Sequence, residues 1–254
     1  MQLNDRYRKI FGNTPIFGML HLAGNNPVER ALEEIEIFEN EGVDAAIVEN
    51  YHSKSTQNVI ETLEVLSEKK TNVKLGLNIL PNEFYISIPL AHQYNLDFVQ
   101  LDHVSGNYIE DVTLPFDDYR NVKEKHSEVI VLGGVHPKYY YPAEGSVLEE
   151  DLKIGMQRAE AIVVTGEGTG MPTPLDKIIR FREVLGDHPL VVGAGLTPSN
   201  AYEQLCIADG AIVGSSLKQN SNTRNPIDAH LVREFMSIVH EVREYKKKRQ
   251  INMV

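Results

Sequence analysis

Ionisable side chains directly follow several short apolar runs of this sequence. His21 follows the first run, Glu49 ends the second and Asp102 ends the fourth. A carboxylate or imidazole at the edge of an apolar run lies next to a medium of low dielectric constant, where its pKa can be tuned for proton transfer. We therefore expect Glu49 and Asp102 to divide the roles of acid and base, with His21 as a third catalytic group. The alternative for each carboxylate is structural: it bonds strand-end backbone or pairs with a lysine.

Two asparagines, Asn50 and Asn78, occupy corresponding positions after the second and third runs. With His21 they would orient a substrate, because amides both donate and accept hydrogen bonds. A divalent metal is a weaker interpretation, because the candidate ligands lack compact spacing such as H-E-x-x-H, and no metal or other cofactor is predicted. Those candidate ligands are His21, Glu49, Asp102 and His136.

Glycine-bearing segments follow the last two apolar runs. Glycine lets backbone N–H groups approach phosphate oxygens, and a helix that begins there adds partial positive charge. The two segments therefore predict a site for phosphate or a similar anion; the alternative is that the glycines only make tight strand-to-helix turns. The residues expected to bind the anion are Gly193, Ala194, Gly195, Gly214, Ser215 and Ser216.

A third glycine-rich segment follows the sixth run. The hydroxyl groups of Thr165 and Thr169 can donate to phosphate or sugar oxygens, and Gly166 and Gly170 would let the segment fold over a ligand. Glu167 would repel a phosphate and is expected to face outward. The alternative is a solvated loop that leads into a proline-initiated helix.

The elements that position these residues alternate along the whole chain. The apolar runs are continuous rather than alternating, as is typical of parallel strands buried on both faces, and they recur about every 28 residues. Segments with helical spacing separate them. The eight predicted strands lie in residues 15–21, 43–50, 73–79, 96–103, 128–134, 160–166, 189–195 and 209–216.

Eight strand-helix units without a linker predict one α/β domain over residues 1–254, a closed (β/α)8 barrel with the strand ends at its mouth. The alternative is an open doubly wound sheet. It lacks support, because no G-x-G-x-x-G follows the first strand. Two segments, 104–127 and 135–148, exceed a minimal barrel and would lie over the mouth, where long loops act as lids or oligomer contacts.

The composition of the chain disfavours several classes of binding partner. The 254 residues have a formal net charge of −11, which opposes binding to nucleic acid or anionic lipid. A single cysteine, Cys206, leaves no intramolecular disulfide, and no apolar stretch is long enough to cross a membrane. We expect a cytoplasmic protein without membrane insertion, with a homo-oligomer as a possibility.

Other catalytic classes lack support. Lys54, Lys138 and Lys218 lie in loops rather than at strand ends, which disfavours a Schiff-base aldolase. Neither a P-loop nor a G-x-S-x-G motif occurs, so nucleotide hydrolysis by a Walker mechanism and serine-ester chemistry lack support as well. Six further histidines belong to no recognisable constellation: His52, His92, His126, His188, His230 and His240.

The motifs resemble those of the BtpA family of predicted TIM-barrel proteins over residues 14–240. The resemblance rests on Gly18-Met-Leu-His-Leu, Glu41-Gly-Val-Asp-Ala-Ala-Ile-Val-Glu-Asn, Gly76-Leu-Asn-Ile-Leu-Pro-Asn, Val164-Thr-Gly-Glu-Gly-Thr-Gly, Val192-Gly-Ala-Gly-Leu-Thr-Pro-Ser-Asn and Ala208-Asp-Gly-Ala-Ile-Val-Gly-Ser-Ser-Leu-Lys. It implies the barrel and supports as site positions His21, Glu49, Asn50, Asn78, Thr165, Gly166, Thr169, Gly170, Gly193, Gly195, Gly214 and Ser215. The loops after His21 and after Asn50 depart from the family pattern, which puts the substrate in doubt.

Two functions from different classes remain open. The leading hypothesis is an isomerase, epimerase or lyase that acts on a small phosphorylated metabolite, such as a sugar phosphate or phosphoribosyl compound. The alternative follows from the resemblance, because the family is named for a member implicated in photosystem I accumulation. In that case the barrel is a non-enzymatic assembly factor that binds another protein.

Overall fold

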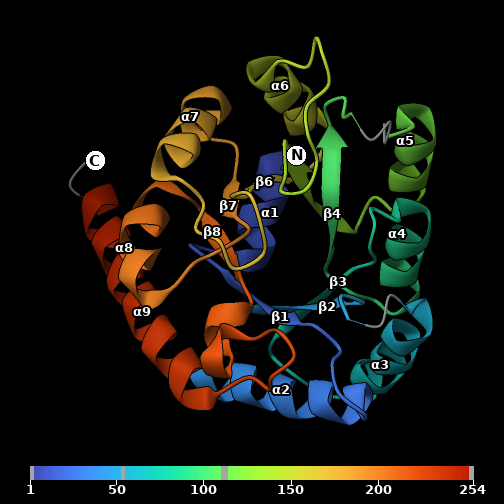
Figure 1. Ribbon diagram of the computed structural model, residues 1–254, viewed down its shortest axis with the longest axis vertical. Coiled ribbons are helices and arrows are strands. Elements are labelled where there is room, and N and C mark those ends of the chain that lie inside the picture. Colours follow the sequence, from blue (N-terminus) through green and yellow to red (C-terminus); the bar gives the residue numbers. More distant parts are fainter. Residues whose placement is uncertain (1–2, 53–54, 110–113, 252–254) are drawn as a thin grey trace.

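A computed structural model describes residues 3–52, 55–109 and 114–251. Eight parallel strands close into a barrel in chain order, with helices around it (Figure 1), so the predicted (β/α)8 fold is confirmed. Within the described residues, no helix is both long and apolar enough to cross a membrane. The strands are β1 (Ile16–Leu20), β2 (Ala45–Glu49), β3 (Lys74–Asn78), β4 (Phe98–Ser105), β5 (Ile130–Val135), β6 (Ala161–Val164), β7 (Leu190–Val192) and β8 (Gly210–Val213).

Helices α2 to α9 lie in the segments between and after the strands, where helical spacing was predicted. Gly42 ends α2 in the left-handed conformation, with φ of 78°, and Pro27 and Pro198 stand in the first turns of α2 and α8. The α-helices are α1 (Leu3–Phe11), α2 (Pro27–Glu41), α3 (Thr56–Glu68), α4 (Phe84–Gln93), α5 (Phe116–Lys125), α6 (Leu148–Arg158), α7 (Leu175–Leu185), α8 (Pro198–Ile207) and α9 (Ala229–Ile251). Two short 3₁₀ turns, η1 (Ser215–Leu217) and η2 (Gln219–Ser221), follow β8.

The polar segment at the start of the chain forms a helix, which the sequence analysis did not predict. Helix α1 lies behind the centre of the barrel in Figure 1, and it buries Tyr7 and Phe11. The Phe11 ring makes edge contacts with Phe17 and Phe98, at 5.0 and 5.3 Å between centroids. Because these aromatic side chains fill the barrel below the strand ends, the interior is a packed core rather than a pore.

One acidic residue precedes each even-numbered strand, and we call these four residues the basal carboxylates: Asp44, Asp97, Glu160 and Asp209. Each accepts a hydrogen bond from a backbone N–H at the start of the preceding strand. The donors, in the same order, are Ile16 at 2.8 Å, Leu75 at 3.2 Å, Val131 at 2.8 Å and Leu190 at 2.9 Å. Each basal carboxylate also pairs with a cation, and those partners are Arg243, Lys74, Arg6 with Lys123, and Arg182. The N-terminal end of the barrel is thereby tied together across long stretches of chain.

The two long loops pair with each other beside the mouth. Tyr108 and Pro142 form an antiparallel bridge, and the Ile109 N–H donates to the Tyr141 carbonyl at 2.8 Å. Strand β4 continues to Ser105, beyond its predicted end, with a register shift against β5 after Leu101. The first of the two long segments, 104–127, is therefore paired with the second, 135–148. Residues 110–113 lie outside the described residues.

Candidate active site

The two predicted catalytic carboxylates, Glu49 at the end of β2 and Asp102 in β4, flank Asn78 at the end of β3. We call Glu49 and Asp102 the mouth carboxylates. The Asn78 amide donates to Glu49 Oε1 at 2.9 Å, and a hydrogen bond from Asn78 also lowers the pKa of Asp102. Asn78 thus bridges the two carboxylates. It lies at the mouth, as predicted, but its contacts with the two carboxylates could not be read from the sequence.

Burial changes the acidity of both mouth carboxylates. It raises the pKa of Glu49 from its ordinary value of 4.5 to about 7; Lys138 opposes this increase, and the Asp102 charge adds to it. Burial also raises the pKa of Asp102, against the lowering effects of Lys138, Tyr140 and Asn78. A carboxyl group with a pKa near 7 can both accept and donate a proton at neutral pH, so Glu49 is suited to general acid-base catalysis.

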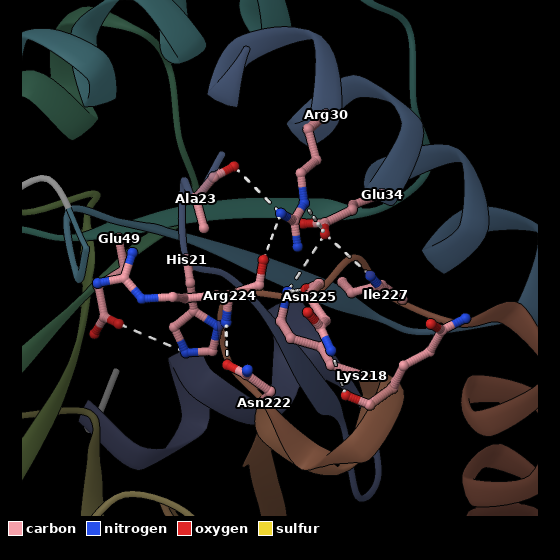
Figure 2. A network of polar contacts seen from close by, with 11 residues as sticks. His21, Ala23, Arg30, Glu34, Glu49, Lys218, Asn222, Arg224, Asn225 and Ile227 are labelled. Carbon is pink, nitrogen blue, oxygen red and sulfur yellow. Dashed lines mark hydrogen bonds and ion pairs between the residues drawn. The ribbon is translucent and has the colours of Figure 1, made fainter. Parts of the chain in front are cut away.

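His21 lies beside Glu49, with 3.9 Å between His21 Nε2 and Glu49 Oε2 (Figure 2). Burial is the largest cause of the lowered pKa of His21, and Lys218 and His52 lower it further. The ring packs against Tyr51 and His52, at 5.3 and 6.2 Å between centroids. His21 is therefore a neutral imidazole at neutral pH, able to donate or accept a hydrogen bond at Nε2. His52, to which the sequence analysis gave no role, belongs to this wall.

Lys138 is the site residue that the sequence analysis missed. It lies past the end of β5, in a segment expected over the mouth, but the sequence analysis used its loop position only to disfavour a Schiff-base aldolase and gave it no role. The loop folds inward and brings Lys138 to the mouth. The Lys138 N–H donates to Thr165 Oγ1 at 2.7 Å, and its Nζ donates to Thr169 Oγ1 at 3.2 Å. Sequence spacing carries no signal for this inward fold.

Lys177 of α7 fixes the base of that loop. Its Nζ donates to the carbonyl oxygens of His136 and Thr165, at 3.1 and 2.8 Å. The two segments that carry Lys138 and Thr165 are therefore held by one cation beneath them. Glu167 is exposed, as expected.

The glycine-bearing segments after β7 and β8 line one small pocket, which we call the anion notch. Within the described chain, no acceptor is found for the N–H groups of Ala194, Gly195, Ser215 and Ser216. The Gly193 N–H is different, because it donates to the Val164 carbonyl at 2.7 Å. Gly193 therefore cannot offer its N–H to an anion, which corrects part of the prediction. The notch is also lined by His21, Glu49, Tyr51, Lys138, Thr169, Gly170 and Gly214.

Close backbone contact explains why glycine occurs in the notch. A Cβ on Gly195 would lie 2.1 Å from the Met171 carbonyl oxygen, and its φ of 67° disfavours other residues. A Cβ on Gly214 would lie 2.9 Å from Cε1 of His21. These steric needs show that the turn interpretation of the glycines also holds, alongside the free N–H groups.

A second and wider hollow, of about 640 Å³, opens next to the notch, and we call it the wide cavity. The notch and the wide cavity share five lining residues: Glu49, Tyr51, Gln100, Lys138 and Gly193. The other residues that line the wide cavity include Asn78, Leu80, Pro81, Asp102, Pro137, Tyr139, Tyr140 and Thr165. Glu49 and Lys138 therefore lie at the junction of the two spaces.

Three expected site residues are directed elsewhere. Both polar ends of the Asn50 amide bond the Leu80 backbone, at 2.8 and 3.4 Å, so Asn50 shapes the turn after β3 instead of facing a ligand. Gly166 is buried beneath the Pro172 carbonyl. His136 Nε2 lies 2.7 Å from Asp151 Oδ2, and among the described residues His136 does not form a group of candidate metal ligands with His21, Glu49 and Asp102.

A buried ionic cluster supports the loop after β8, as Figure 2 shows. Glu34 Oε1 accepts from Arg30 Nε at 2.9 Å, from Lys218 Nζ at 3.3 Å and from the Ile227 N–H at 3.1 Å. Lys218 is buried in this cluster, in the loop position that the sequence predicted. Lys54 lies outside the described residues.

Metal ligands come together elsewhere. Among the described residues, the one group of three His or acidic side chains whose ligand atoms lie within 4.8 Å of one another is His92, His126 and Glu128. His92 lies in the last turn of α4, and His126 and Glu128 follow α5, so the group lies at the N-terminal end of the barrel, opposite the mouth. The sequence analysis saw no constellation for His92 and His126, because their proximity arises only when the two helices pack side by side.

Comparison with known proteins gives a family and a fold. The model of the BtpA family matches residues 15–241. An uncharacterized protein of Thermococcus kodakarensis is 26% identical over 92% of this chain and 98% of its own. The photosystem I biogenesis protein BtpA of Synechocystis is 24% identical over 93% of this chain and 92% of its own.

Solved structures with the same architecture are distant in sequence. Tryptophan synthase from M. tuberculosis superposes with a TM-score of 0.64 at 15% identity, over 93% of this chain and 98% of that one. Phosphoribosyl anthranilate isomerase from Thermococcus kodakaraensis gives 0.59 at 19% identity, over 89% and 98%. At such identities the likeness establishes the barrel fold alone.

Proposed function

This chain belongs to the BtpA family, and we propose that it is an enzyme that performs acid-base chemistry, as an isomerase, epimerase or lyase, on a small phosphorylated metabolite. The observation that carries the proposal is the place of Glu49. This carboxyl group, with its pKa of about 7, lies at the junction of the anion notch and the wide cavity. A proton can thus be exchanged next to a bound anion.

The phosphate would bind in the anion notch. The N–H groups of Ala194, Gly195, Ser215 and Ser216, which have no acceptor among the described residues, supply donors. Lys138, which also lines the notch, adds a positive charge. The Thr169 hydroxyl, which accepts from Lys138, is a further donor. Binding through backbone groups and one lysine suits a phosphate monoester in a protein of net charge −11.

The catalytic groups would act on the carbon skeleton beside that phosphate. Glu49 would move the proton, and Asp102 would act as its counterpart across Asn78. His21, neutral and next to Glu49, would donate a hydrogen bond to a developing oxyanion. Cytoplasmic location and homo-oligomer formation stay predictions from the sequence.

A second candidate, a protein-binding assembly factor, is favoured by the name of the Synechocystis relative. Binding to another protein would not require ionisable groups around an open cavity of about 640 Å³ at the mouth. The two functions differ in one measurable property, the binding of phosphorylated small molecules.

The test is thermal unfolding of the protein with inorganic phosphate, ribose 5-phosphate and other sugar phosphates against salt-matched controls. A ligand at 100 times its Kd stabilises a protein by about 2.7 kcal/mol. We expect a selective shift that Gly214→Asp and Ser216→Asp each abolish, because either carboxylate would repel the phosphate. A shift no larger than that of the salt control would reject the enzyme proposal in favour of the assembly factor.

The catalytic part has its own test once a substrate is found. Glu49→Gln keeps the hydrogen bond from Asn78 but cannot exchange a proton, so turnover should fall by about 10²- to 10⁴-fold while ligand-induced stabilisation persists. Loss of both together would mark Glu49 as structural.

A further inference from the structure

We propose that the substrate carries a flat apolar group, an aromatic or heterocyclic ring, at the end opposite its phosphate, and that the wide cavity binds this ring. The inference rests on the proposed function, because the anion notch supplies the phosphate half of the ligand. It goes further by assigning the other half: a hydroxylated linker across the junction and a ring beyond it.

The sizes of the two spaces point to a two-part ligand. The anion notch offers about 50 Å³, enough for little more than a phosphoryl group, whereas the wide cavity offers about 640 Å³. Cavities of roughly 300–1,000 Å³ typically hold ligands of drug size. A small sugar phosphate would occupy the notch and the junction, and it would leave most of the wide cavity without a ligand group.

The lining of the wide cavity suits a ring rather than a polyol. Leu80, Pro81, Pro137, Tyr139 and Tyr140 present apolar surface there. A hydroxylated chain gains little from such a wall, because its polar groups would lose hydrogen bonds to water. A flat ring removes apolar area from water on both partners and can pack against a tyrosine face.

Tyr140 is held as a rigid part of this wall. Its ring lies 5.1 Å from the His103 ring and 5.5 Å from the Tyr108 ring, and its hydroxyl donates to Asp102 Oδ2 at 3.2 Å. Anchoring at the edge and at the hydroxyl fixes the orientation of the ring before any ligand binds. Tyr139 is 58% exposed at the rim, where its hydroxyl contacts Thr169 Oγ1 at 3.2 Å.

The polar atoms between the two ends favour a linker with donors. Asn78 Oδ1 and Gln100 Oε1 are buried acceptors with no partner among the described residues, and both side chains line the wide cavity. Buried acceptors normally receive hydrogen bonds, so a ligand with hydroxyl or N–H groups at this depth would satisfy them. Phosphate, hydroxylated linker and ring, in that order, describe a phosphorylated glycoside of an aromatic or heterocyclic base.

The experiment is isothermal titration calorimetry with graded probes. The affinity for inorganic phosphate reports on the anion notch, and the additional affinity for ribose 5-phosphate reports on the linker. AMP, UMP and nicotinamide mononucleotide add purine, pyrimidine and pyridine rings to the same phosphorylated ribose. We expect at least one nucleotide to bind tenfold or more tightly than ribose 5-phosphate.

Variants of the wall locate the gain. Tyr140→Ala or Leu80→Ala should reduce the advantage of the nucleotide to less than about threefold and leave the affinity for ribose 5-phosphate within twofold, because neither residue lines the anion notch. Tyr140→Phe keeps the ring and should keep most of the advantage. Tyr85→Ala, which removes a half-exposed tyrosine on α4, is the matched control and should change neither affinity. Because Leu80 is only half-buried, its variant remains informative if Tyr140→Ala fails to fold.

The outcomes separate this inference from the proposed function. If ribose 5-phosphate binds, but no nucleotide binds more tightly, the ring is wrong and the phosphate enzyme stands. If the advantage of the nucleotide survives both alanine variants, the ring does not lie in the wide cavity and the inference fails. If neither phosphate nor ribose 5-phosphate binds, the proposed function fails first.

Discussion

The two ends of this barrel use carboxylates in opposite ways. At the N-terminal end, the basal carboxylates Asp44, Asp97, Glu160 and Asp209 each bond backbone N–H and pair with a cation. At the C-terminal end, the buried Glu49 and the half-buried Asp102 lie on either side of the neutral Asn78 amide, and their pKa values are raised. The same functional group stabilises one end and is poised for proton transfer at the other.

The difference teaches where this fold places stabilising and chemical groups. Cations and N–H donors next to a carboxylate offset its charge, so such a group ties its neighbours together. A buried carboxylate without such partners destabilises the charged form, and the protein retains that strain only where it serves another purpose. The comparison therefore assigns the mouth carboxylates to function and the basal carboxylates to the integrity of the barrel, in line with the division typical of such barrels.

The largest effect is expected at the basal carboxylate Glu160. Its side chain is fully buried and bonds Arg6 at 2.7 Å, Lys123 at 2.9 Å and the Val131 N–H at 2.8 Å. Glu160→Ala leaves two cations and one N–H without this partner, and it should lower the free energy of unfolding by about 3 to 5 kcal/mol in urea titrations.

A surface pair gives the control for this change. Glu36→Ala removes the partner of Lys69, but the Glu36 side chain is 64% exposed, so the loss should stay below about 1 kcal/mol. If Glu160→Ala and Glu36→Ala lowered the free energy of unfolding equally, the stabilising role of the basal carboxylates would be contradicted.

The next effect is expected at Glu49, with the opposite sign. Its pKa of about 7 in the folded state exceeds the ordinary 4.5 of the unfolded chain, so stability falls as pH rises from about 4.5 to about 7. Glu49→Gln removes this loss. Relative to the wild type, the variant should therefore gain about 3 kcal/mol between pH 4 and pH 8, as measured by urea unfolding at each pH.

A variant of the same mouth provides the comparison. Thr169→Val removes no ionisable group, so its difference from the wild type should be nearly independent of pH. A Glu49→Gln difference that is equally flat would mean that Glu49 does not titrate near neutrality, and the contrast between the two ends would collapse.

The smallest effect is expected at Asn200, which supports the anion notch through backbone contacts. Its side chain accepts from the Thr197 N–H at 2.8 Å and donates to the Gly195 carbonyl at 3.0 Å. Asn200→Ala should destabilise the protein by about 1 kcal/mol and weaken phosphate binding severalfold, because Gly195 loses an anchor.

Asn26 offers a matched substitution for this effect. It occupies the N-cap of α2 without a side-chain cap bond. Asn26→Ala should therefore lower the free energy of unfolding by less than Asn200→Ala does, and it should leave the affinity for phosphate unchanged. If the two variants weaken phosphate binding equally, the notch does not depend on this support.

Much of the fold follows from local patterns in the sequence. The continuous apolar runs predicted all eight strands, because parallel strands buried on both faces need apolar side chains throughout. Helix α1 escaped prediction because the residues that it buries, Tyr7 and Phe11, stand among charged ones and find their core only inside the closed barrel.

The candidate site was predictable to the extent that strand ends define it. Glu49, Asn78 and Asp102 meet because consecutive parallel strands bring their carboxyl ends to one edge. Asn50 was assigned to the same edge, but its amide turns to the Leu80 backbone, since the side chain at a strand end can face either side. Lys138 lay beyond prediction because its position depends on a loop that Lys177 and Thr165 hold in place.

The sequence by itself determined the order of strands and helices, the glycines that allow close backbone contact, and the set of polar groups at the mouth. Only the tertiary structure decided which carboxylates are paired. Arg6 reaches Glu160 and Arg243 reaches Asp44 across more than half of the chain, whereas no such cation pairs with Glu49 among the described residues. The pKa of a carboxylate depends on burial and on neighbours in space, and closure of the barrel sets both.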